Sequence, residues 1–417
     1  MQDIALVTID CWRHDAPERM PNLAAAETVT ERRDALCQSA ATRGAFPALL
    51  SGLYYPQAYS GFDAVADGVR SLPEVLADAG YATCGIVGSN PFLSTWAPAF
   101  DRFWNDGMTT DGDQSALGER LQAGASTLRH AANYLRLRSR VPATDVAARA
   151  REWYESQEGP RFVWLHLMDV HVPFFPGLAR GLSTGLLDAY RAHYRFMDDP
   201  HSLTDAEYET LEELYWQSVA ALDEQLPEVL AFLDDDAHVA IVGDHGEEFR
   251  HDEWGHARLY DECTRVPFLA SESLAASLGD GEHLRQLDVP ATLLDAVGLD
   301  VPDEWEGGPA READPYPAFA INHSPQFGEL YAAVRGERYK LLRTFDAETG
   351  RLQRTEAYDM DADPGETTDL SGSAELSALE SELDAFLARE AIEGNLREDE
   401  RDVSAKVEDR LQALGYK

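Results

Sequence analysis

The feature that most constrains the fold of this chain is a short apolar run, Val239–Val242, followed by Gly243, Asp244 and His245. Four small or β-branched apolar residues in a row predict one buried strand. Asp244 and His245 would then stand at the carboxyl end of that strand, where open α/β sheets usually bind their ligands. A carboxylate beside an imidazole offers an oxygen and a nitrogen to a divalent cation. Taken alone, the same residues are equally typical of an acidic loop, so the metal hypothesis depends on the rest of the chain.

A second apolar run, Ile4–Ile9, lies almost at the start of the sequence and ends in Asp10. Its uninterrupted apolar character predicts a central parallel strand. A carboxylate at the end of such a strand is a natural metal ligand, although an isolated Asp is also a common helix N-cap. Asp10, Asp244 and His245 are therefore candidate metal ligands at the ends of two apolar strands.

Residues 41–52 pass from small residues into an apolar stretch, which predicts a loop that leads into the N-terminus of a short helix. The free N–H groups and positive dipole of such an end suit an anion. Thr42 stands at this entrance, and its hydroxyl can attack phosphorus or sulfur if a metal lowers its pKa. Arg43 is next to it, and a guanidinium can clamp a tetrahedral oxyanion. The simpler alternative for Thr42 is an N-cap residue.

Three more polar residues are candidates for binding a substrate. His171 comes after a predicted strand at Phe162–Leu165 and precedes Val-Pro, which favours an extended loop. Its imidazole can donate to a leaving-group or non-bridging oxygen, and the alternative is a structural histidine bonded to backbone. Asn90 follows a predicted strand at Ala82–Val87 and can donate to a substrate oxygen, although Asn-Pro is first a turn signal. His256 can bind the same anion or act as an acid.

The charge of the chain excludes one class of partner. Among its 417 residues, 75 are acidic and 35 are Lys or Arg, so the formal net charge is -40. The lysines are Lys340, Lys406 and Lys417. Such acidity argues against nucleic-acid binding and is typical of the acidic proteome of a halophilic cytoplasm, where surface carboxylates stay hydrated. We therefore expect the fold to be lost at low salt, because the Debye length grows from about 3 Å at 1 M to about 30 Å at 0.01 M.

The four cysteines, Cys11, Cys37, Cys84 and Cys263, form no CxxC pair and are too sparse for a disulfide framework. Reduced thiols are the usual state in a cytosolic protein. The N-terminus lacks the basic and long apolar regions of a signal peptide, and no apolar run approaches the roughly 20 residues of a membrane span. We therefore expect a cytoplasmic protein in a high-salt cytosol, without a transmembrane segment.

The composition changes near residue 307, where the stretch 307–317 is rich in Gly, Pro and acidic residues. We divide the chain there into a large α/β unit, 1–306, and a smaller unit, 307–417. The smaller unit is predicted to be an α+β subdomain with an antiparallel sheet. Its strands are expected at Ala318–Asn322, Leu330–Val334, Tyr339–Arg343 and Glu356–Met360, with a helix over 373–391. The larger unit is predicted to have helices over 71–79, 144–157 (with Thr144 as N-cap), 204–232 and 288–298. A surface turn is expected over 100–104. The basic stretch 129–140 is either a solvated face or a contact for an anionic partner.

Together, and in this order, the segments resemble the sulfatase family of the alkaline phosphatase superfamily over nearly the whole chain. The resemblance rests on Asp10–Asp15, Leu49–Tyr54 (close to the family's LLTGLYP), His171–Pro173, Gly243–Glu247, Tyr260–Pro267 and Ala357–Leu370 (close to LYDLxxDPxExxNL). It implies a large mixed, mostly parallel sheet flanked by helices, which forms a catalytic domain over 1–306. It also implies one divalent metal ion held by Asp10, Thr42, Asp244 and His245, with His171 and His256 on the sulfuryl or phosphoryl oxygens.

The sequence departs from the family pattern at the nucleophile. Family sulfatases carry Cys or Ser in C/S-x-P-x-R and oxidise it to formylglycine, whereas Thr42 stands at that position here, with Gly44 and Phe46 in place of the Pro and Arg. We therefore expect no formylglycine and an unmodified Thr nucleophile, which resembles the phosphodiesterase and phosphoglycerol-transferase branches of the superfamily. Cys11 stands where many sulfatases carry a second Asp, and His256 where many carry a Lys.

Three functions are compatible with these residues. The first is a metal-dependent hydrolase of sulfate or phosphate esters, in which Thr42 forms a covalent intermediate that water cleaves. The second is a phosphodiesterase or a phospho-headgroup transferase, in which an alcohol can replace that water. The third is a non-catalytic relative that binds an anion or a partner, against which the joint presence of Asp10, Thr42, Asp244 and His245 argues. The ligand is expected to be a small anionic ester and the metal Mn, Mg, Ca or Zn, with one His among carboxylates favouring Mn or Zn over Ca; the oligomeric state is left open.

Overall fold

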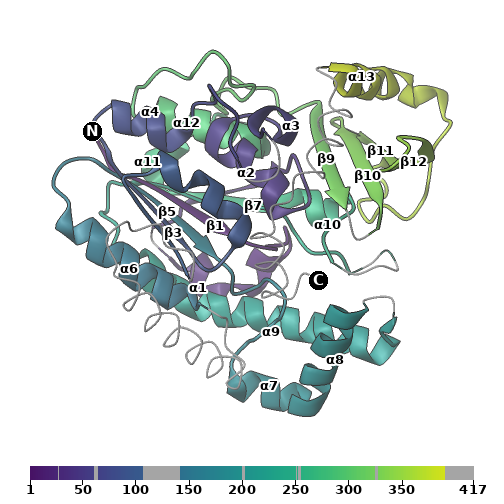
Figure 1. Cartoon of the computed structure of the whole chain (residues 1–417), viewed down its shortest axis with the longest axis horizontal. Helices are drawn as coiled ribbons and strands as arrows, with labels where there is room; N and C mark the ends of the chain where they lie inside the picture. The colour runs from purple at the N-terminus through teal and green to yellow at the C-terminus, as the bar shows by residue number, and fades with distance from the viewer. Residues whose placement is uncertain are drawn as a thin grey trace.

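A central eight-stranded sheet organises the fold (Figure 1). The computed structural model describes residues 1–26, 28–60, 64–106, 141–199, 202–249, 251, 255–324 and 327–389, so the basic stretch 129–140 lies outside the described residues. The strands are β1 (Ile4–Ile9), β2 (Glu31–Leu36), β3 (Ala82–Val87), β4 (Arg102–Asn105), β5 (Arg161–Leu167), β6 (His238–Gly243), β7 (Arg265–Ala270) and β8 (His283–Arg285), in the order β4-β3-β5-β1-β6-β7-β2-β8. Five neighbouring pairs are parallel, and β6–β7 and β7–β2 are antiparallel. The mixed, mostly parallel sheet is confirmed.

The strand β1 is buried on both faces, which explains its continuous apolar sequence. Successive side chains of a strand point to opposite faces. Ile4 and Leu6 accordingly belong to one hydrophobic core, and Ala5 and Val7 belong to the other. Each core closes the sheet against a layer of helices, so the strand ends are held in place from both sides.

Helices cover both faces of this sheet (Figure 1). One layer includes α2 (Thr42–Ser51), α4 (Leu72–Asp78), α11 (Glu272–Ala275) and α12 (Val289–Ala296), and the other includes α1 (Pro21–Ala24), α6 (Ala143–Ser156) and α9 (Asp205–Leu230). The remaining helices are η1 (Ala16–Arg19), α3 (Tyr55–Ala58), η2 (Pro91–Ala99), α7 (Leu178–Thr184), α8 (Leu186–Asp198), α10 (Asp261–Thr264), η4 (Gln286–Asp288), η5 (Ala374–Leu376) and α13 (Ser377–Ala388). The predicted helices near 71–79, 144–157, 204–232 and 288–298 are confirmed, with ends that differ by a few residues.

The register of the central strands brings their carboxyl ends to one line. Ile9 of β1 lies opposite Leu167 of β5 and Gly243 of β6. The next residues continue the pairing, because the N–H of Asp10 donates to Leu167 O at 3.0 Å and that of Asp244 donates to Ile9 O at 3.3 Å. Two segments more than 230 residues apart in sequence therefore deliver their carboxylates to the same edge.

A second sheet of four antiparallel strands lies beside the first (Figure 1). Its order is β12 (Leu352–Asp359), β11 (Tyr339–Asp346), β10 (Glu329–Arg335) and β9 (Ala318–Ser324). The predicted C-terminal antiparallel sheet and helix are confirmed as elements. Ile321, Leu341 and Phe386 belong to the same hydrophobic core as Leu49 of α2, so this subdomain packs on the larger unit. The division at residues 306 and 307 stays a prediction.

Two local predictions were wrong. Residues 102–105 form the edge strand β4, paired with β3, where a surface turn was expected. The helix α6 begins at Ala143, and its N-cap is Pro142 rather than Thr144. The Pro142 carbonyl accepts from the N–H groups of Asp145 and Val146 at 2.9 and 3.2 Å, so the helix starts two residues earlier than the hydroxyl of Thr144 suggested.

In the described part of the chain, no helix is both long and apolar enough to cross a membrane.

Candidate active site

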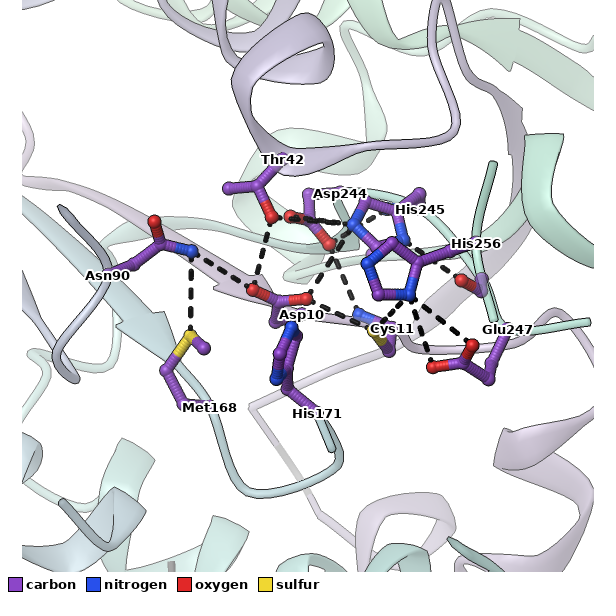
Figure 2. Close-up of polar contacts among 12 residues, drawn as sticks. Asp10, Cys11, Thr42, Asn90, Met168, His171, Asp244, His245, Glu247 and His256 are labelled. Atoms are coloured by element: carbon purple, nitrogen blue, oxygen red, sulfur yellow. Dashed lines mark hydrogen bonds and ion pairs between the residues drawn. The ribbon is translucent and has the colours of Figure 1, made fainter. Parts of the chain in front are cut away.

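Five of the predicted residues meet at the carboxyl edge of the central sheet (Figure 2). Asp10 follows β1, and Asp244 and His245 follow β6. Thr42 is the first residue of α2, and Asn90 follows β3 and caps η2 through its side chain. All five are buried, with at most 6% of their surface exposed. Three strand ends and one helix N-terminus therefore build the candidate site.

The hydroxyl of Thr42 faces Asp10 and His245 rather than capping its own helix. Its Oγ1 donates to Asp10 Oδ2 at 3.2 Å and lies 3.4 Å from His245 Nε2. The N-cap residue of α2 is Ala41, which makes no side-chain capping bond. A Cβ atom on Gly44 would lie 2.2 Å from the Ser39 hydroxyl, so only glycine lets this first turn pack so closely on the preceding loop. The alternative of Thr42 as an N-cap is wrong.

His245 completes a ring of oxygen and nitrogen atoms around a common centre. Its Nε2 lies 3.6 Å from Asp10 Oδ1 and 3.7 Å from Asp244 Oδ2. Its Nδ1 lies 2.9 Å from the Gly246 carbonyl oxygen, which orients the ring. Burial lowers the pKa of His245 to about 4, with His256 adding to the effect. The imidazole is therefore neutral at physiological pH, which is the form that binds metals.

The two carboxylates titrate in opposite directions. Burial, and then the negative charge of Asp10, raise the pKa of Asp244 well above its usual range. Burial acts in the same sense on Asp10, but His171, the hydrogen bond from His166 and the charge of His245 outweigh it and lower the pKa of Asp10. Two buried carboxylates so close together repel each other when both are ionised. A cation between them would remove that conflict.

The geometry fits a divalent cation held by Asp10, Thr42, Asp244 and His245. Two ligands about 2.1 Å from one ion lie about 3.0–3.4 Å apart at octahedral or tetrahedral angles. Four separations within this cluster, from 3.2 to 3.7 Å, are close to that range. Asp10 also belongs to two groups of ligand atoms that lie within 4.8 Å of one another, one with Cys11 and His245 and one with His166 and Asp244. Among the residues that the structure describes, Asp244 Oδ2 has no hydrogen-bond donor although it is buried. An orphaned carboxylate oxygen in such a ring is the donor that a metal would use.

The loop that carries Asp244 and His245 is fixed by close backbone packing. A Cβ atom on Gly246 would lie 1.9 Å from the Glu262 carbonyl oxygen, so no other residue fits at this position. The N–H of Gly246 donates to Cys263 O at 2.8 Å. Arg13 also holds this loop in place. Its guanidinium donates to the Glu247 carbonyl at 2.6 Å and forms an ion pair with Glu262 at 2.7 Å. The ligand-bearing turn is thus pre-shaped by its surroundings.

His171 and His256 lie next to this ring (Figure 2). Their ring centroids are 5.5 Å apart, and His256 stacks on His245 at 4.5 Å. Burial lowers the pKa of His171. Burial alone would do the same to His256, but Glu247, 3.3 Å from His256 Nδ1, raises its pKa. His256 is therefore the member of the pair that holds a proton more readily and can bring one to the site.

The side chains of Asn90 and Arg43, both predicted to contact the substrate, have different surroundings in the structure. Asn90 Nδ2 donates to Asp10 Oδ2 at 3.3 Å, so its side chain points into the ring. The guanidinium of Arg43 lies over the rings of Tyr55 and Tyr59, 4.6 and 5.0 Å from their centroids, and donates to the Tyr55 hydroxyl. The role of Arg43 as an anion clamp stays a prediction.

Three residues of the cluster had no predicted role in it. His166 of β5 places Nε2 3.3 Å from Asp10 Oδ2, while its Nδ1 lies 2.9 Å from Thr8 Oγ1. The thiol of Cys11 donates to Asp10 Oδ1 at 3.2 Å and lies 3.6 Å from His256 Nδ1. Glu247 is the partner of His256. A polar residue on a buried strand next to β1 was the available signal for His166, and adjacency to predicted ligands was the signal for Cys11 and Glu247.

The family of the chain follows from comparisons with known proteins. The sulfatase family model matches residues 12–299. Two curated relatives come from Bacteroides thetaiotaomicron: an N-acetylglucosamine-6-O-sulfatase, 25% identical over 193 residues (40% of this chain and 33% of the relative), and a Delta 4,5-hexuronate-2-O-sulfatase, 29% identical over 168 residues (36% and 33%). The aligned part thus spans about a third of the length of these relatives.

Solved structures share the fold at low sequence identity. One, in complex with its substrate D-glucosamine-2-N,6-O-disulfate, has a TM-score of 0.65 and 16% identity, and the match covers 96% of this chain and 100% of that one. A phosphonate monoester hydrolase of Agrobacterium radiobacter has the same TM-score and identity, with 95% and 96% covered. Because the family model matches well over half of its residues, the chain belongs to the sulfatase family.

Proposed function

We propose that the protein is a metal-dependent hydrolase that cleaves small sulfate or phosphate esters with Thr42 as the nucleophile. The observation that carries this proposal is the ring formed by Asp10, Thr42, Asp244 and His245, in which the Asp244 carboxylate has an oxygen without a donor among the described residues. The relatives act on sulfate esters by their names, which supports an ester as the substrate class.

The proposed first step is attack of Thr42 Oγ1 on sulfur or phosphorus. A bound divalent cation would lower the pKa of the hydroxyl and neutralise the oxygens of the ester. The hydroxyl proton leaves toward Asp10 Oδ2, the acceptor that it faces at 3.2 Å. A bond forms between Oγ1 and the central atom, and the bond from that atom to the alcohol oxygen breaks. His256 then supplies the proton that the leaving alcohol needs, and His171 holds a non-bridging oxygen.

The second step releases the anion from Thr42. A water molecule attacks the sulfur or phosphorus, the bond to Oγ1 breaks, and Oγ1 takes back its proton from Asp10 Oδ2. The imidazole of His256, neutral after the first step, takes the proton of that water. The same residue thus serves as acid and then as base, a cycle that its contact with Glu247 supports.

The surroundings of Thr42 support an unmodified hydroxyl as the nucleophile. Phe46 stands where sulfatases with formylglycine carry an Arg, and its ring packs on Trp164 and His166 at 5.1 Å in both cases. This position is fully buried and apolar, so it supplies no cation to a modified residue. In this proposal the protein works without formylglycine, in a high-salt cytoplasm, with residues 1–306 as the catalytic domain and 307–417 as the supporting one.

Substitution of Thr42 tests the proposal. Thr42→Ala should lose at least about a hundredfold in turnover, the scale of losing one catalytic group, while it still binds metal through Asp10, Asp244 and His245. Thr42→Ser should keep part of the activity because it keeps the hydroxyl. Ser39→Ala is the matched control, since Ser39 is an equally buried hydroxyl in the same loop that donates to Asn322 at 3.1 Å instead. Turnover is measured with nitrophenyl sulfate, phosphate and phosphodiester in high salt with a panel of divalent metals.

Three results would contradict this proposal. Near-normal turnover in Thr42→Ala would show that another residue is the nucleophile. A mass shift for formylglycine at any cysteine of the intact protein would restore the ordinary sulfatase mechanism. Failure of the metal-loaded wild type to cleave any of the three esters would favour a transferase that requires an alcohol acceptor, or a non-catalytic relative.

A further inference from the structure

We infer that His166 of β5 is a further ligand of the divalent cation that we place between Asp10, Thr42, Asp244 and His245. This inference rests on the proposed function, because it adds a nitrogen to the same metal site. Ligand atoms of Asp10, His166 and Asp244 lie within 4.8 Å of one another. The sequence pattern assigned no role to His166, so the evidence for it comes from its surroundings alone.

His166 is a polar residue near the carboxyl end of a buried strand. β5 reads Arg-Phe-Val-Trp-Leu-His-Leu, and the side chain of His166 is fully buried. Its Nε2 lies 3.3 Å from Asp10 Oδ2, but the contact is too poorly aligned for a strong hydrogen bond, and no other described residue offers Nε2 a partner. A buried polar atom without a partner is costly. His166 Nε2 and Asp244 Oδ2 are thus two orphaned ligand atoms in the same group as Asp10.

The contact of the other ring nitrogen determines which electron pair of His166 is free. Nδ1 lies 2.9 Å from Thr8 Oγ1. The Thr8 hydroxyl donates to Leu165 O at 3.2 Å and accepts from Trp164 Nε1 at 3.0 Å. Because a hydroxyl has one proton and Thr8 directs it to Leu165, its oxygen receives a proton from Nδ1. The free electron pair of the neutral imidazole is therefore on Nε2. Metal-bound histidines have this arrangement, in which the second nitrogen donates to a neighbour.

The electrostatics of this contact favour a cation. The electron pair of His166 Nε2 and the carboxylate of Asp10 face each other at 3.3 Å, and both side chains are fully buried. The imidazole is held in this direction, because its ring packs edge-on against Phe46 at 5.1 Å and Thr8 binds Nδ1. A proton on Nε2 relieves the repulsion in the metal-free protein, and a divalent cation relieves it with twice the charge.

The distances require only a small adjustment. Two ligands with bonds of about 2.1 Å to one ion lie about 3.0–3.4 Å apart when they are adjacent and about 4.2 Å apart when they are opposite. The 3.3 Å between His166 Nε2 and Asp10 Oδ2 fits an adjacent pair. The group that includes Asp244 lies within 4.8 Å. A cation therefore has at most a few tenths of an ångström to close.

A second imidazole changes the metal that the site prefers. Carboxylate and hydroxyl oxygens suit magnesium and calcium, whereas imidazole nitrogens suit zinc and its neighbours. With His166 beside His245, the site has two nitrogen ligands. The wild type should therefore prefer zinc over magnesium more strongly than a variant that lacks the imidazole of His166.

Nuclear magnetic resonance of the full-length protein tests this inference. A spin-active isotope of cadmium, which replaces zinc, couples to an imidazole nitrogen only when the two atoms are bonded. In protein with isotope-labelled histidine, cadmium should couple to Nε2 of both His245 and His166. His166→Leu should lose the second coupling and bind zinc at least about tenfold more weakly, the lower end of the cost of losing a partner of a metal ligand. His238→Leu is the matched control, because His238 is a buried histidine on β6 outside the site, and it should keep both couplings and the zinc affinity.

The other outcomes separate this inference from the proposed function. Coupling to His245 without coupling to His166 would overturn the inference and leave the proposed metal site intact. Coupling to neither would contradict both. Coupling to both without turnover of any ester would uphold the ligand and contradict the proposed hydrolase. Because the wild-type spectrum decides these cases, they hold even if His166→Leu fails to fold. A folded His166→Leu with the zinc affinity of the wild type would also overturn the inference.

Discussion

Two buried groups of charges in this protein are built in opposite ways. At the carboxyl edge of the large sheet, Asp10 and Asp244 have no lysine or arginine partner in the described part of the chain. At the junction with the small sheet, Lys340 of β11 lies 2.7 Å from Asp261 of α10 and 2.8 Å from Glu366. Lys340 is 1% exposed, and both of its partners are also buried. One group lacks a countercharge and the other contains it.

This difference indicates different roles: the Asp10–Asp244 group is a candidate binding site, and the Lys340 group stabilises the packing of the two sheets. A buried charge is costly unless it is paired, so carboxylates without a partner need either a proton or a cation from outside. The pKa of Asp244, raised by burial and by Asp10, is the sign of that need. The pKa of Asp261 is lowered to about 2, because Lys340 outweighs the effect of burial. The first group is therefore open to a metal, and the second ties the two sheets together without one.

The largest expected effect comes from removing the built-in countercharge. Lys340→Met should lower the free energy of unfolding by about 3–5 kcal/mol, because it leaves the Asp261 carboxylate buried and unpaired. Turnover per folded molecule should stay that of the wild type. Denaturant unfolding in high salt measures the loss, and the triple variant Lys340→Met, Asp261→Asn, Glu366→Gln is the control, which should recover part of it. A loss under about 0.5 kcal/mol, the usual range for a surface substitution, would show that the group is not a support.

An intermediate effect is expected from supplying the missing countercharge. A cation at about 100 times its dissociation constant stabilises the fold by about 2.7 kcal/mol, and magnesium is the probe because the ring of Asp10, Thr42, Asp244 and His245 offers mainly oxygen ligands. Asp244→Asn should remove this gain together with turnover. Without metal, the same variant should unfold no more readily than the wild type, because an amide carries no buried charge. Thermal unfolding of the wild type and of Asp244→Asn, each with magnesium and with a chelator, measures both effects. If magnesium raises the melting temperature of the variant as much as that of the wild type, the ion binds elsewhere.

The smallest effect concerns pH, because a single proton is involved and Lys340 stays paired with Asp261. Burial raises the pKa of Glu366 to about 7, with Lys340 opposing and Asp261 assisting. The folded protein thus holds this proton more tightly than the unfolded chain. Its contribution to stability is complete below the ordinary value near 4.5 and is lost as the pH rises through about 7.

Glu366→Gln isolates that contribution. Denaturant midpoints between pH 4.5 and 7.5 should fall less steeply in the variant than in the wild type, and the metal affinity should not change. Parallel pH profiles for the two proteins would mean that Glu366 is already ionised in the fold, and the contrast between the two groups of charges would then be weaker than we describe.

The parts of the fold that were predictable are those with local signals. The apolar runs Ile4–Ile9 and Val239–Val242 predicted two central strands, and the parallel register then carries Asp10 and Asp244 to one edge. The strands of the small sheet were also predictable, because each alternates or runs apolar between turn residues. By contrast, β2 reads Glu-Arg-Arg-Asp-Ala-Leu and β7 contains a proline, so neither resembles a buried strand in isolation. β7 pairs with both β2 and β6, and these pairings depend on tertiary contacts that neither sequence reveals by itself.

The site was predictable to the extent that its residues sit at strand ends or at a helix entrance. Thr42, Asn90 and His245 were identified in this way, and the structure places them around Asp10. His166 was not, because its approach to Asp10 depends on the neighbouring positions of β5 and β1 in the sheet. The direction of the Arg43 side chain depends on Tyr55 and Tyr59, which the spacing of residues does not reveal. Contacts between elements, rather than the elements themselves, are what the sequence leaves open.

The burial of Lys340 has a consequence for how the protein can be handled. The chain has only three lysines, and this is the one within the described residues. An amine-reactive reagent cannot reach its ammonium group, 1% exposed and paired twice, while the two sheets stay packed. Acylation of Lys340 therefore requires that this junction opens. Mass spectrometry can follow the reaction, because the peptide that contains Lys340 gains the mass of one acyl group. Because lysine is so scarce in this chain, the rate of acylation at Lys340 reports how often the two sheets separate.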